Sequence, residues 1–315
     1  MNEQTIVIAL GGNAILQPGQ KGTAQEQMEN IATACEHLTE IISSGKYRVV
    51  ITHGNGPQVG NVLLQNEAAS SLVPVMPLDI CGAATQGTMG YMIQQTLANH
   101  LRAADLKHNI TTVVTQVIVD KNDPAFDKPT KPVGPFYKKE EAQQLREERG
   151  WVIVKDSGRG YRRVVPSPKP LKIQESRIIN GMLNSGEIVI AVGGGGIPVV
   201  REKNRSLRGI EAVIDKDLAA ERLAKDIDAD IFMVLTDVEQ VMLNYGKEDE
   251  MGIAQMTVAE AEKYLAEGQF GEGSMKPKVE AGFNFVKSGG DKMLITSLTK
   301  ASKALQGKAG TIIIP

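Results

Sequence analysis

Lysine and aspartate side chains occur where they could serve the transfer of a phosphoryl group. Asp215, Lys216 and Asp217 stand directly before a helical segment, and two carboxylates beside a lysine can orient its ammonium group. Phosphoryl transfer depends above all on neutralising crowded negative charge, which such a lysine supplies. The alternative is a solvated helix start, in which Asp217 is simply an anion favoured by the helix dipole. The spacing alone leaves both interpretations open.

Lys278 falls in the first turn of a second helical segment, where the helix dipole disfavours a cation. A residue placed against its local preference is often functional, and a phosphate bound there would explain this lysine. Thr236 and Asp237 follow an apolar strand, where they could cap the next element or border a nucleotide pocket.

Three glycine-rich loops each follow a predicted strand. They are Gly11-Gly12-Asn13-Ala14, Gly54-Asn55-Gly56-Pro57-Gln58 and Gly193-Gly194-Gly195-Gly196. Glycine lets consecutive backbone N–H groups converge on an anion, and asparagine adds a small side-chain donor. One such loop alone would indicate a tight turn. Three at strand ends favour a cradle for a phosphate or a carboxylate.

Several other kinds of site are excluded or weakly supported. The sequence has no G-x-x-x-x-G-K-[ST] motif, and Gly11-Gly12 lacks the third glycine of a dinucleotide-binding fingerprint. The histidines, at positions 37, 53, 100 and 108, lack the spacing of metal ligands, so we expect no zinc site and a structural role for His53. The nucleophile motif G-x-S-x-G is also missing.

The elements that must position these residues alternate between strands and helices. The patterns predict strands at 5–10, 48–52, 111–119, 188–192, 231–235, 292–296 and 311–314, and helices at 28–42, 59–69, 85–104, 173–183, 216–224, 257–267 and 275–288. Such alternation is typical of a mostly parallel sheet with helices on both faces. Ligands then bind beyond the carboxyl ends of the strands, where the glycine loops lie.

Composition narrows the class of protein. The 315 residues are 42% hydrophobic with a net charge of -2, which argues against a dedicated nucleic-acid binder. No apolar run approaches the roughly 20 residues that span a bilayer, and the first residues lack the basic region of a signal peptide. Only Cys35 and Cys81 occur, so no disulfide framework is possible. We expect a cytoplasmic α/β protein with no nucleic-acid or membrane partner.

Residues 120–170 differ in composition from the rest of the chain. They contain 12 Lys/Arg against 8 Asp/Glu, and 7 of the 14 prolines. Proline restricts the backbone, so Lys131 can be presented there on a semi-rigid loop. This insert could be a basic lid that closes over an anionic substrate, or a surface excursion whose charges are merely solvated.

Seven motifs, in order along the chain, closely resemble those of the carbamate kinases, a branch of the amino acid kinase family. They are ALGGNA at 9–14, HGNGPQVGN at 53–61, NDPAFDKPTKPVGPFY at 122–137, VVPSPKP at 164–170, GGGGIPVV at 193–200, EAVIDKDLA at 211–219 and GSMKPKVEA at 273–281. The resemblance covers essentially the whole chain. The proline-rich insert separates this branch from the acetylglutamate, glutamate and uridylate kinases.

The resemblance implies one amino acid kinase domain over residues 1–315, a homodimer, and an α/β fold. That fold would be a three-layer αβα sandwich around a central, mainly parallel sheet, with residues 120–170 as a protruding lid subdomain. The implied activity is reversible phosphoryl transfer between ADP plus carbamoyl phosphate and ATP plus carbamate, favouring ATP synthesis. The implied cofactor is Mg²⁺, held mainly by the phosphates rather than by protein side chains.

The resemblance also implies roles for particular residues. Lys131, Lys216 and Lys278 correspond to three phosphate-contacting lysines, and Asp217 to the carboxylate that orients lysines. The substrate and phosphate cradle would consist of Gly11, Gly12, Asn13, Gly54, Asn55 and Gly56. The third glycine loop adds Gly194 and Gly195 to this cradle. The nucleotide would lie against the part from about residue 210 onward, at Thr236, Asp237, Met275 and Lys278.

Three other functions compete with this one. The first is another acyl-phosphate-forming kinase of the same family, and the second is a non-catalytic nucleotide-binding paralogue. A paralogue of that kind should have lost the charged residues named above, yet all are present. The third, an NAD-dependent oxidoreductase, rests only on the strand–helix alternation and lacks the fingerprint.

Overall fold

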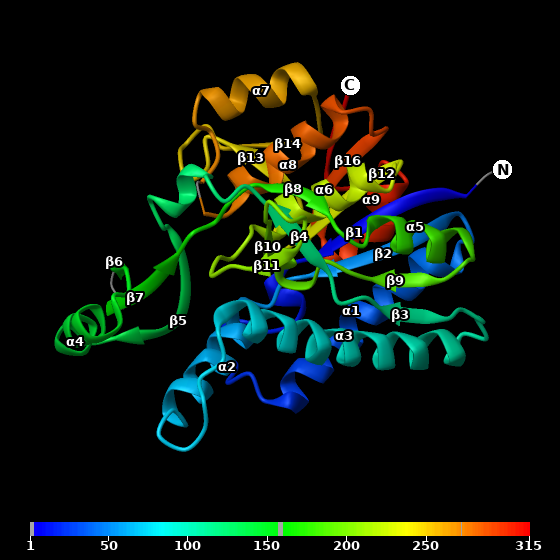
Figure 1. The fold of residues 1–315 in the computed structure, drawn as a ribbon. Helices are drawn as coiled ribbons and strands as arrows, with labels where there is room; N and C mark the ends of the chain where they lie inside the picture. Colours follow the sequence, from blue (N-terminus) through cyan, green and yellow to red (C-terminus); the bar gives the residue numbers. More distant parts are fainter. Residues whose placement is uncertain (1–2, 157–159, 272) are drawn as a thin grey trace.

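A central sheet of eight strands organises the molecule in the computed structural model, which describes residues 3–156, 160–271 and 273–315 (Figure 1). The strand order is β15-β17-β16-β12-β1-β2-β9-β3. The strands are β1 (Gln4–Leu10), β2 (Tyr47–His53), β3 (Ile110–Thr112), β9 (Ile188–Ile190), β12 (Ile231–Thr236), β15 (Gln255–Thr257), β16 (Lys292–Ser297) and β17 (Thr311–Ile314). Neighbours pair in parallel except β16 and β17, which confirms the mainly parallel sheet.

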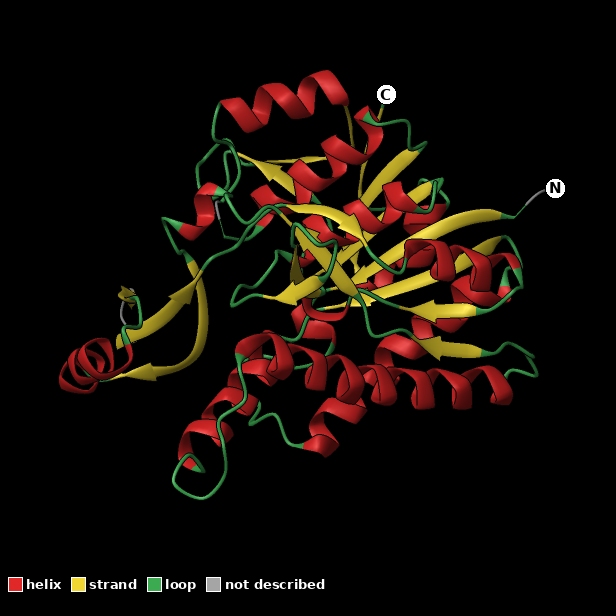
Figure 2. Cartoon of the chain, in the orientation of Figure 1, coloured by secondary structure: helices red, strands yellow, loops and turns green. Residues whose placement is uncertain are grey.

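The sheet is covered on both faces, as its strand sequences require. In β1, Ile6 and Ile8 enter one apolar core while Val7 and Ala9 enter the other, because successive side chains of a strand point to opposite faces. One face packs against α1 (Ala24–Ser43), α3 (Leu78–Ala103) and α9 (Ala301–Leu305), and the other against α5 (Ser176–Asn184), α6 (Lys216–Asp226), α7 (Val258–Ala266) and α8 (Met275–Lys287). Figure 2 shows the helices on both sides of the strands. The three-layer αβα sandwich is therefore confirmed.

The predicted helices are present, and several begin earlier than their apolar pattern. The helix expected at 28–42 starts at Ala24, because Thr23 and Glu26 form a reciprocal capping box. The helix expected at 85–104 starts at Leu78, directly after Pro77. The helix expected at 59–69 is α2 (Gly56–Ala68), which begins within the second glycine loop.

The prediction of a single strand at 111–119 is wrong. The chain forms β3, which ends at Thr112, and resumes as β4 (Gln116–Val119) in a different sheet. The break lies at Thr115, whose Oγ1 donates to the Val113 carbonyl and whose backbone N–H donates to the side chain of Gln86. This second sheet has the order β11-β10-β4-β8 and adds β8 (Pro170–Ile173), β10 (Ile197–Arg201) and β11 (Leu207–Gly209).

The insert leaves the body of the molecule between two paired residues. Val119 of β4 and Pro170 of β8 are register partners, and the intervening chain projects from the body in Figure 1. It contains β5 (Lys131–Tyr137), α4 (Lys139–Arg149), β6 (Ile153–Asp156) and β7 (Gly160–Val165), with β7 as the middle strand of a small antiparallel sheet. Residues 157–159 lie outside the described part.

A small apolar core joins the insert to the body. Val133 of β5 and Val165 of β7 pack with Val59 of α2 and Leu78 of α3. The remaining short elements are the hairpin β13 (Val241–Leu243) and β14 (Met251–Ile253) and the 3-10 turns η1 (Gly12–Ala14), η2 (Pro124–Phe126), η3 (Gly193–Gly195) and η4 (Leu298–Lys300). Among the helices of the described residues, none combines the length and the apolar character needed to cross a membrane.

Candidate active site

The site lies where the central strands end. β1 pairs in parallel with both β2 and β12, so their carboxyl ends meet at one edge of the sheet. Gly11, Gly54 and Asp237 are the residues that follow these three strands. The amino-terminal ends of α6 and α8 reach the same edge, which brings lysines and glycine loops together as the sequence predicted.

Asp217 joins two of the predicted lysines. It lies in the first turn of α6 and is 2% exposed. Its Oδ1 accepts a hydrogen bond from Lys216 Nζ at 2.7 Å, and its Oδ2 accepts one from Lys278 Nζ at 3.1 Å. One carboxylate between two ammonium groups leaves one positive charge uncompensated at the edge of the sheet.

The charge state of Asp217 follows from this arrangement. Burial by itself would raise the pKa of the carboxyl group, because desolvation disfavours the charged form. The nearby charges and hydrogen bonds of Lys216 and Lys278 outweigh burial, and the pKa lies below its ordinary value. Asp217 is therefore ionised at neutral pH and holds both lysines.

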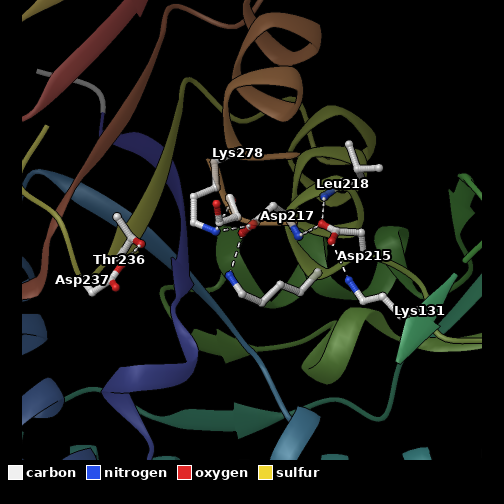
Figure 3. A network of polar contacts seen from close by, with 9 residues as sticks. Lys131, Asp215, Asp217, Leu218, Thr236, Asp237 and Lys278 are labelled. Atoms are coloured by element: carbon white, nitrogen blue, oxygen red, sulfur yellow. Dashed lines mark hydrogen bonds and ion pairs between the residues drawn. The ribbon is translucent and has the colours of Figure 1, made fainter. Parts of the chain in front are cut away.

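Lys131 reaches the same place from the insert. Its Nζ donates to Oδ2 of Asp215 at 2.8 Å, while Oδ1 of Asp215 accepts from the backbone N–H groups of Asp217 and Leu218. Asp215 is thus both the N-cap of α6 and the partner of Lys131. Figure 3 shows Lys131 and Lys278 approaching the two aspartates from opposite sides. We call Lys131, Asp215, Lys216, Asp217 and Lys278 the lysine–aspartate cluster.

The amino terminus of α8 carries Lys278 against the helix dipole. The N-cap residue Ser274 makes no capping hydrogen bond through its side chain, and the first turn contains no acidic residue. Lys278 Nζ also donates to the Ser274 carbonyl at 3.1 Å. An anion would complement both the lysine and the N–H groups of this helix end.

Two glycines show how closely the loops pack. A Cβ on Gly54 would lie 3.4 Å from Cδ of Lys216, so the lysine stem passes directly over this residue. Gly194 has a φ of +67°, and a Cβ there would lie 2.2 Å from Nδ2 of Asn55. The second and third glycine loops therefore pack against each other and against Lys216.

Three adjoining clefts surround the cluster, and Ser274 and Lys278 line all of them. The inner cleft, about 270 Å³, also contains Gly12, Gly54, Asn55, Gly56, Pro57, Lys131, Gly194, Val213, Ile214, Asp215, Lys216, Asp217, Gly273 and Pro277. The middle cleft, about 310 Å³, contains Gly11, Gly12, Ala14, Lys216, Leu235, Thr236, Asp237, Gly273 and Leu298. The outer cleft, about 390 Å³, contains Thr236, Asp237, Val238, Gln240, Met242, Tyr245, Gln269, Phe270, Gly271 and Met275.

Most of the predicted site residues line these clefts. Gly195 is buried beside the Ile214 carbonyl and lines none of the clefts described. The Asn55 amide lines the inner cleft, but its Nδ2 donates to Thr85 Oγ1 at 2.8 Å. Asn13 lies in η1, and its side chain is outside the described part of the structure.

His53 has the structural role expected of it. The ring is 1% exposed and lies against Gly193, where an added Cβ would be 2.5 Å from Nε2. Burial lowers the pKa of His53, and the charge of Lys216 adds to this effect against a hydrogen bond with the Gly54 carbonyl. A neutral, enclosed imidazole of this kind packs beneath the site and does not project into it.

Sequence reasoning missed the role of Asp215 and the apolar wall of the outer cleft. The spacing indicates Asp215 only as one flank of Lys216, although an aspartate before a helix is the usual sign of an N-cap. The wall contains Met242, Tyr245 and Phe270. Tyr245 is 77% exposed, and an aromatic residue in a glycine-containing turn was the one available signal.

Within the described residues, no group of three or more His, Cys, Asp or Glu side chains could hold a metal ion. The two carboxylates of the cluster are engaged by lysines, and Asp237 accepts a hydrogen bond from Thr236 Oγ1.

The sequence model of the amino acid kinase family matches residues 4–297. The chain belongs to the amino acid kinase family. A carbamate kinase of Thermococcus kodakarensis is 54% identical over 311 residues, 98% of each chain, and one of Trichomonas vaginalis is 54% identical over 98% of this chain and 99% of its own. Carbamate kinase from Giardia lamblia bound to AMP-PNP has a TM-score of 0.94 and 46% identity, covering 99% of this chain and 98% of that one. The resemblance inferred from the seven motifs is confirmed.

Proposed function

We propose that the chain catalyses reversible phosphoryl transfer between carbamoyl phosphate and ADP, giving carbamate and ATP, with ATP synthesis favoured. The observation that carries the proposal is the lysine–aspartate cluster, in which two ammonium groups share the buried carboxylate of Asp217 and a third meets Asp215 beside it. Full-length relatives named carbamate kinase, at up to 54% identity, support the same substrate pair.

The proposed reaction needs no general base. A carbamate oxygen is already anionic, so attack on the γ-phosphorus of ATP depends on in-line positioning and on charge neutralisation. In the direction of ATP synthesis, a terminal oxygen of ADP attacks the phosphorus of carbamoyl phosphate, the P–O bond to the carbamoyl group breaks, and carbamate leaves with the electron pair. The lysines bind the oxygens of the transferring group, and no covalent phosphoenzyme forms.

Each lysine has a separate approach to that group. Lys216 and Lys278 are held by Asp217 and line both the inner and the middle cleft. Lys131 comes from the insert and lines the inner cleft only. We infer that Lys216 and Lys278 bind the phosphoryl group both before and after its transfer. Lys131 would bind the phosphoryl group while it is attached to the carbamoyl group.

The clefts suggest how the two substrates are divided. The inner cleft, bordered by Gly54, Asn55, Gly56 and Gly194, would take the carbamoyl group. Gly11 and Gly12 would contact the phosphates in the middle cleft, together with Asn13 by its place in the loop. Thr236, Asp237 and Met275 would contact the nucleotide, whose base would meet the apolar wall of the outer cleft. Residues 120–170 would be the lid subdomain, closing over the inner cleft with Lys131.

Mg²⁺ is the cofactor that we propose, carried on the phosphates of the nucleotide. It would neutralise charge on the phosphate oxygens beyond what the lysines reach. Asp237 is exposed at the border of the middle and outer clefts, where a hydrated ion on the phosphates could accept its carboxylate as an outer ligand.

We also propose that the chain acts as a cytoplasmic homodimer. β3 is one of the two outer strands of the central sheet in the described residues, and it lies beside α3, whose surface includes the exposed side chain of Tyr91. Val114, just past β3, is also exposed. An outer strand with exposed apolar neighbours suits a symmetric contact with a second copy. Sedimentation analysis of the purified protein tests this state. The cytoplasmic location is consistent with two free, buried cysteines.

The experiment that tests the activity compares phosphoryl donors to ADP. ATP formation is measured with carbamoyl phosphate, acetyl phosphate and acetylglutamyl phosphate, in Mg²⁺ and in excess chelator. We expect rapid ATP formation with carbamoyl phosphate and Mg²⁺. A preference for either other donor would indicate a different acyl-phosphate kinase, and no turnover with any donor would indicate a non-catalytic paralogue.

A further inference from the structure

Arg163 is an enclosed arginine on a protruding part of the molecule. It lies on β7, the middle strand of the insert, and its side chain is only 10% exposed. Its Nη2 donates to Oε2 of Glu211 at 3.0 Å, and its guanidinium carbon lies 4.3 Å from the centre of the Trp151 ring. Stacking on an aromatic face while pairing with a carboxylate fixes a guanidinium in one orientation.

The partner of Arg163 lies on the loop that also holds the partner of Lys131. Residues 210–215 connect β11 to α6, with Glu211 near the start and Asp215 at the end. Two basic side chains of the insert therefore engage two carboxylates of one loop on the body. A backbone hydrogen bond of 2.9 Å from the Val213 N–H to the Pro166 carbonyl joins the same loop to the residue after β7.

Strand pairing links Arg163 to the position of Lys131. In the pairing of β5 with β7, Lys131 lies opposite Val165, and Val133 lies opposite Arg163. A displacement of β7 at Arg163 would therefore carry Lys131 with it. When a catalytic group is misplaced by about 1 Å, the reaction can slow by about 100-fold. The position of β7 on the body therefore matters for Lys131, whose ammonium group must contact the phosphoryl group.

We propose that Arg163, backed by Trp151, is a positioning residue for the phosphoryl transfer proposed above. Its ion pair with Glu211 seats the insert on the loop of residues 210–215 and so sets where the ammonium group of Lys131 meets the transferring group. Arg163 touches neither substrate. Its effect on the reaction passes through Lys131, and the inference rests on the proposed function.

The test is a coupling experiment between the ion pair and Lys131. Arg163→Ala and Glu211→Gln are each made in the wild-type chain and in a Lys131→Ala chain, and ATP formation from ADP and carbamoyl phosphate is measured. In the wild-type chain we expect each to lower kcat by about tenfold, with the KM for ADP changed less than about twofold. In the Lys131→Ala chain each substitution should lower kcat by less than about a further twofold, because the effects of substituting residues that act together do not add.

Arg146→Ala is the matched control. Arg146 also lies beside an aromatic ring of the insert, 5.7 Å from the centre of Tyr161, and it donates to the Ile153 carbonyl. These contacts stay within the insert, so this variant should keep kcat within about twofold of the wild type. The inference is overturned if Arg146→Ala loses as much as Arg163→Ala, or if the losses from Arg163→Ala are equal in both chains.

Two further readouts keep the outcomes distinct. Glu211 is 55% exposed, so Glu211→Gln decides the matter alone if Arg163→Ala does not fold. Trp151 is the single tryptophan of the chain, and its fluorescence should change in Arg163→Ala and Glu211→Gln but not in a variant that leaves the stack in place. A wild-type chain inactive with carbamoyl phosphate refutes the proposed function and this role together. An active wild type with unaltered variants refutes this role alone.

Discussion

Lys278 Nζ lies 3.1 Å from Oδ2 of Asp217, although 61 positions separate the two residues in the sequence. The contact joins the start of α8 to the start of α6 across the edge of the sheet. Two helix amino termini that each favour an anion are thus held together by a carboxylate and a lysine. The arrangement leaves room for a phosphate where both helices point.

Asp217→Asn keeps the shape of the side chain and removes the charge that Lys216 and Lys278 share. We expect kcat for ATP formation to fall by about 10- to 100-fold, because the two ammonium groups lose the group that orients them. The melting temperature should also fall, since like charges then face each other at a buried position. Steady-state kinetics and thermal unfolding by circular dichroism measure the two effects.

Asp226→Asn is the control for this variant. Asp226 lies on the same helix, pairs with Arg222 and accepts a hydrogen bond from the Ile173 N–H, away from the clefts. It should lower the melting temperature while leaving kcat within about twofold of the wild type. Equal losses of kcat in the two variants would show that Asp217 acts only through the stability of α6.

Glu221 should make the free energy of unfolding depend on pH. Burial raises the pKa of this carboxyl group from 4.5 to about 7, against the opposing charges of Lys225 and Arg222. Its Oε1 has no hydrogen-bond partner, and Lys225 Nζ lies 3.7 Å away. Because the folded state binds this proton more tightly than the unfolded state, stability falls as the pH rises from about 4.5 to about 7, by about 3 kcal/mol at most.

Glu221→Gln removes that dependence. Urea unfolding at pH 5 and pH 8 should show a smaller loss of stability in the variant than in the wild type, with the variant more stable at pH 8. All other titrating groups are shared by the two proteins and cancel in the difference. Parallel pH profiles for the two proteins would show that Glu221 is as acidic in the folded chain as in the unfolded one.

Gln86→Leu tests the support of the third glycine loop. The Gln86 amide is buried, donates to the Thr115 and Gly193 carbonyls at 3.2 and 3.0 Å, and accepts from the Thr115 N–H. Leucine leaves these groups unpaired, which should cost about 1–3 kcal/mol of stability. The KM for carbamoyl phosphate should rise while the KM for ADP stays unchanged. The reason is that Gly194 of this loop lines the inner cleft and neither of the other two clefts.

Gln94→Leu supplies the comparison for Gln86→Leu. Gln94 lies two turns further along α3 and accepts hydrogen bonds from the N–H and Oγ1 of Thr112. It holds an outer strand and not the glycine loop, so its substitution should leave both KM values unchanged. A rise in the KM for carbamoyl phosphate in both variants would attribute the effect to α3 as a whole.

The strands that carry the site could be predicted because both of their faces are buried. In β1, every residue from Thr5 to Leu10 is enclosed, and a continuous apolar run ending in two glycines predicts such a strand. Lys278 could be predicted as unusual because a cation in the first turn of a helix conflicts with the helix dipole.

The contacts that assemble the site could not be predicted in the same way. Asp215 combines a local role, as the cap of α6, with a partner 84 positions away in Lys131, and only the first leaves a pattern in the sequence. The break at Thr115 depends on the side chain of Gln86 from another element, so the apolar pattern of 111–119 indicates one strand where there are two.

The rate of ATP formation from ADP and carbamoyl phosphate in Lys216→Ala and Lys278→Ala tests the central claim most directly. Both lysines lie within hydrogen-bond distance of Asp217 and line the clefts where transfer would occur. With Mg²⁺ present and circular dichroism unchanged, each variant should lose about 100- to 1000-fold in kcat relative to the wild type. Turnover at the wild-type rate in both folded variants would contradict the claim.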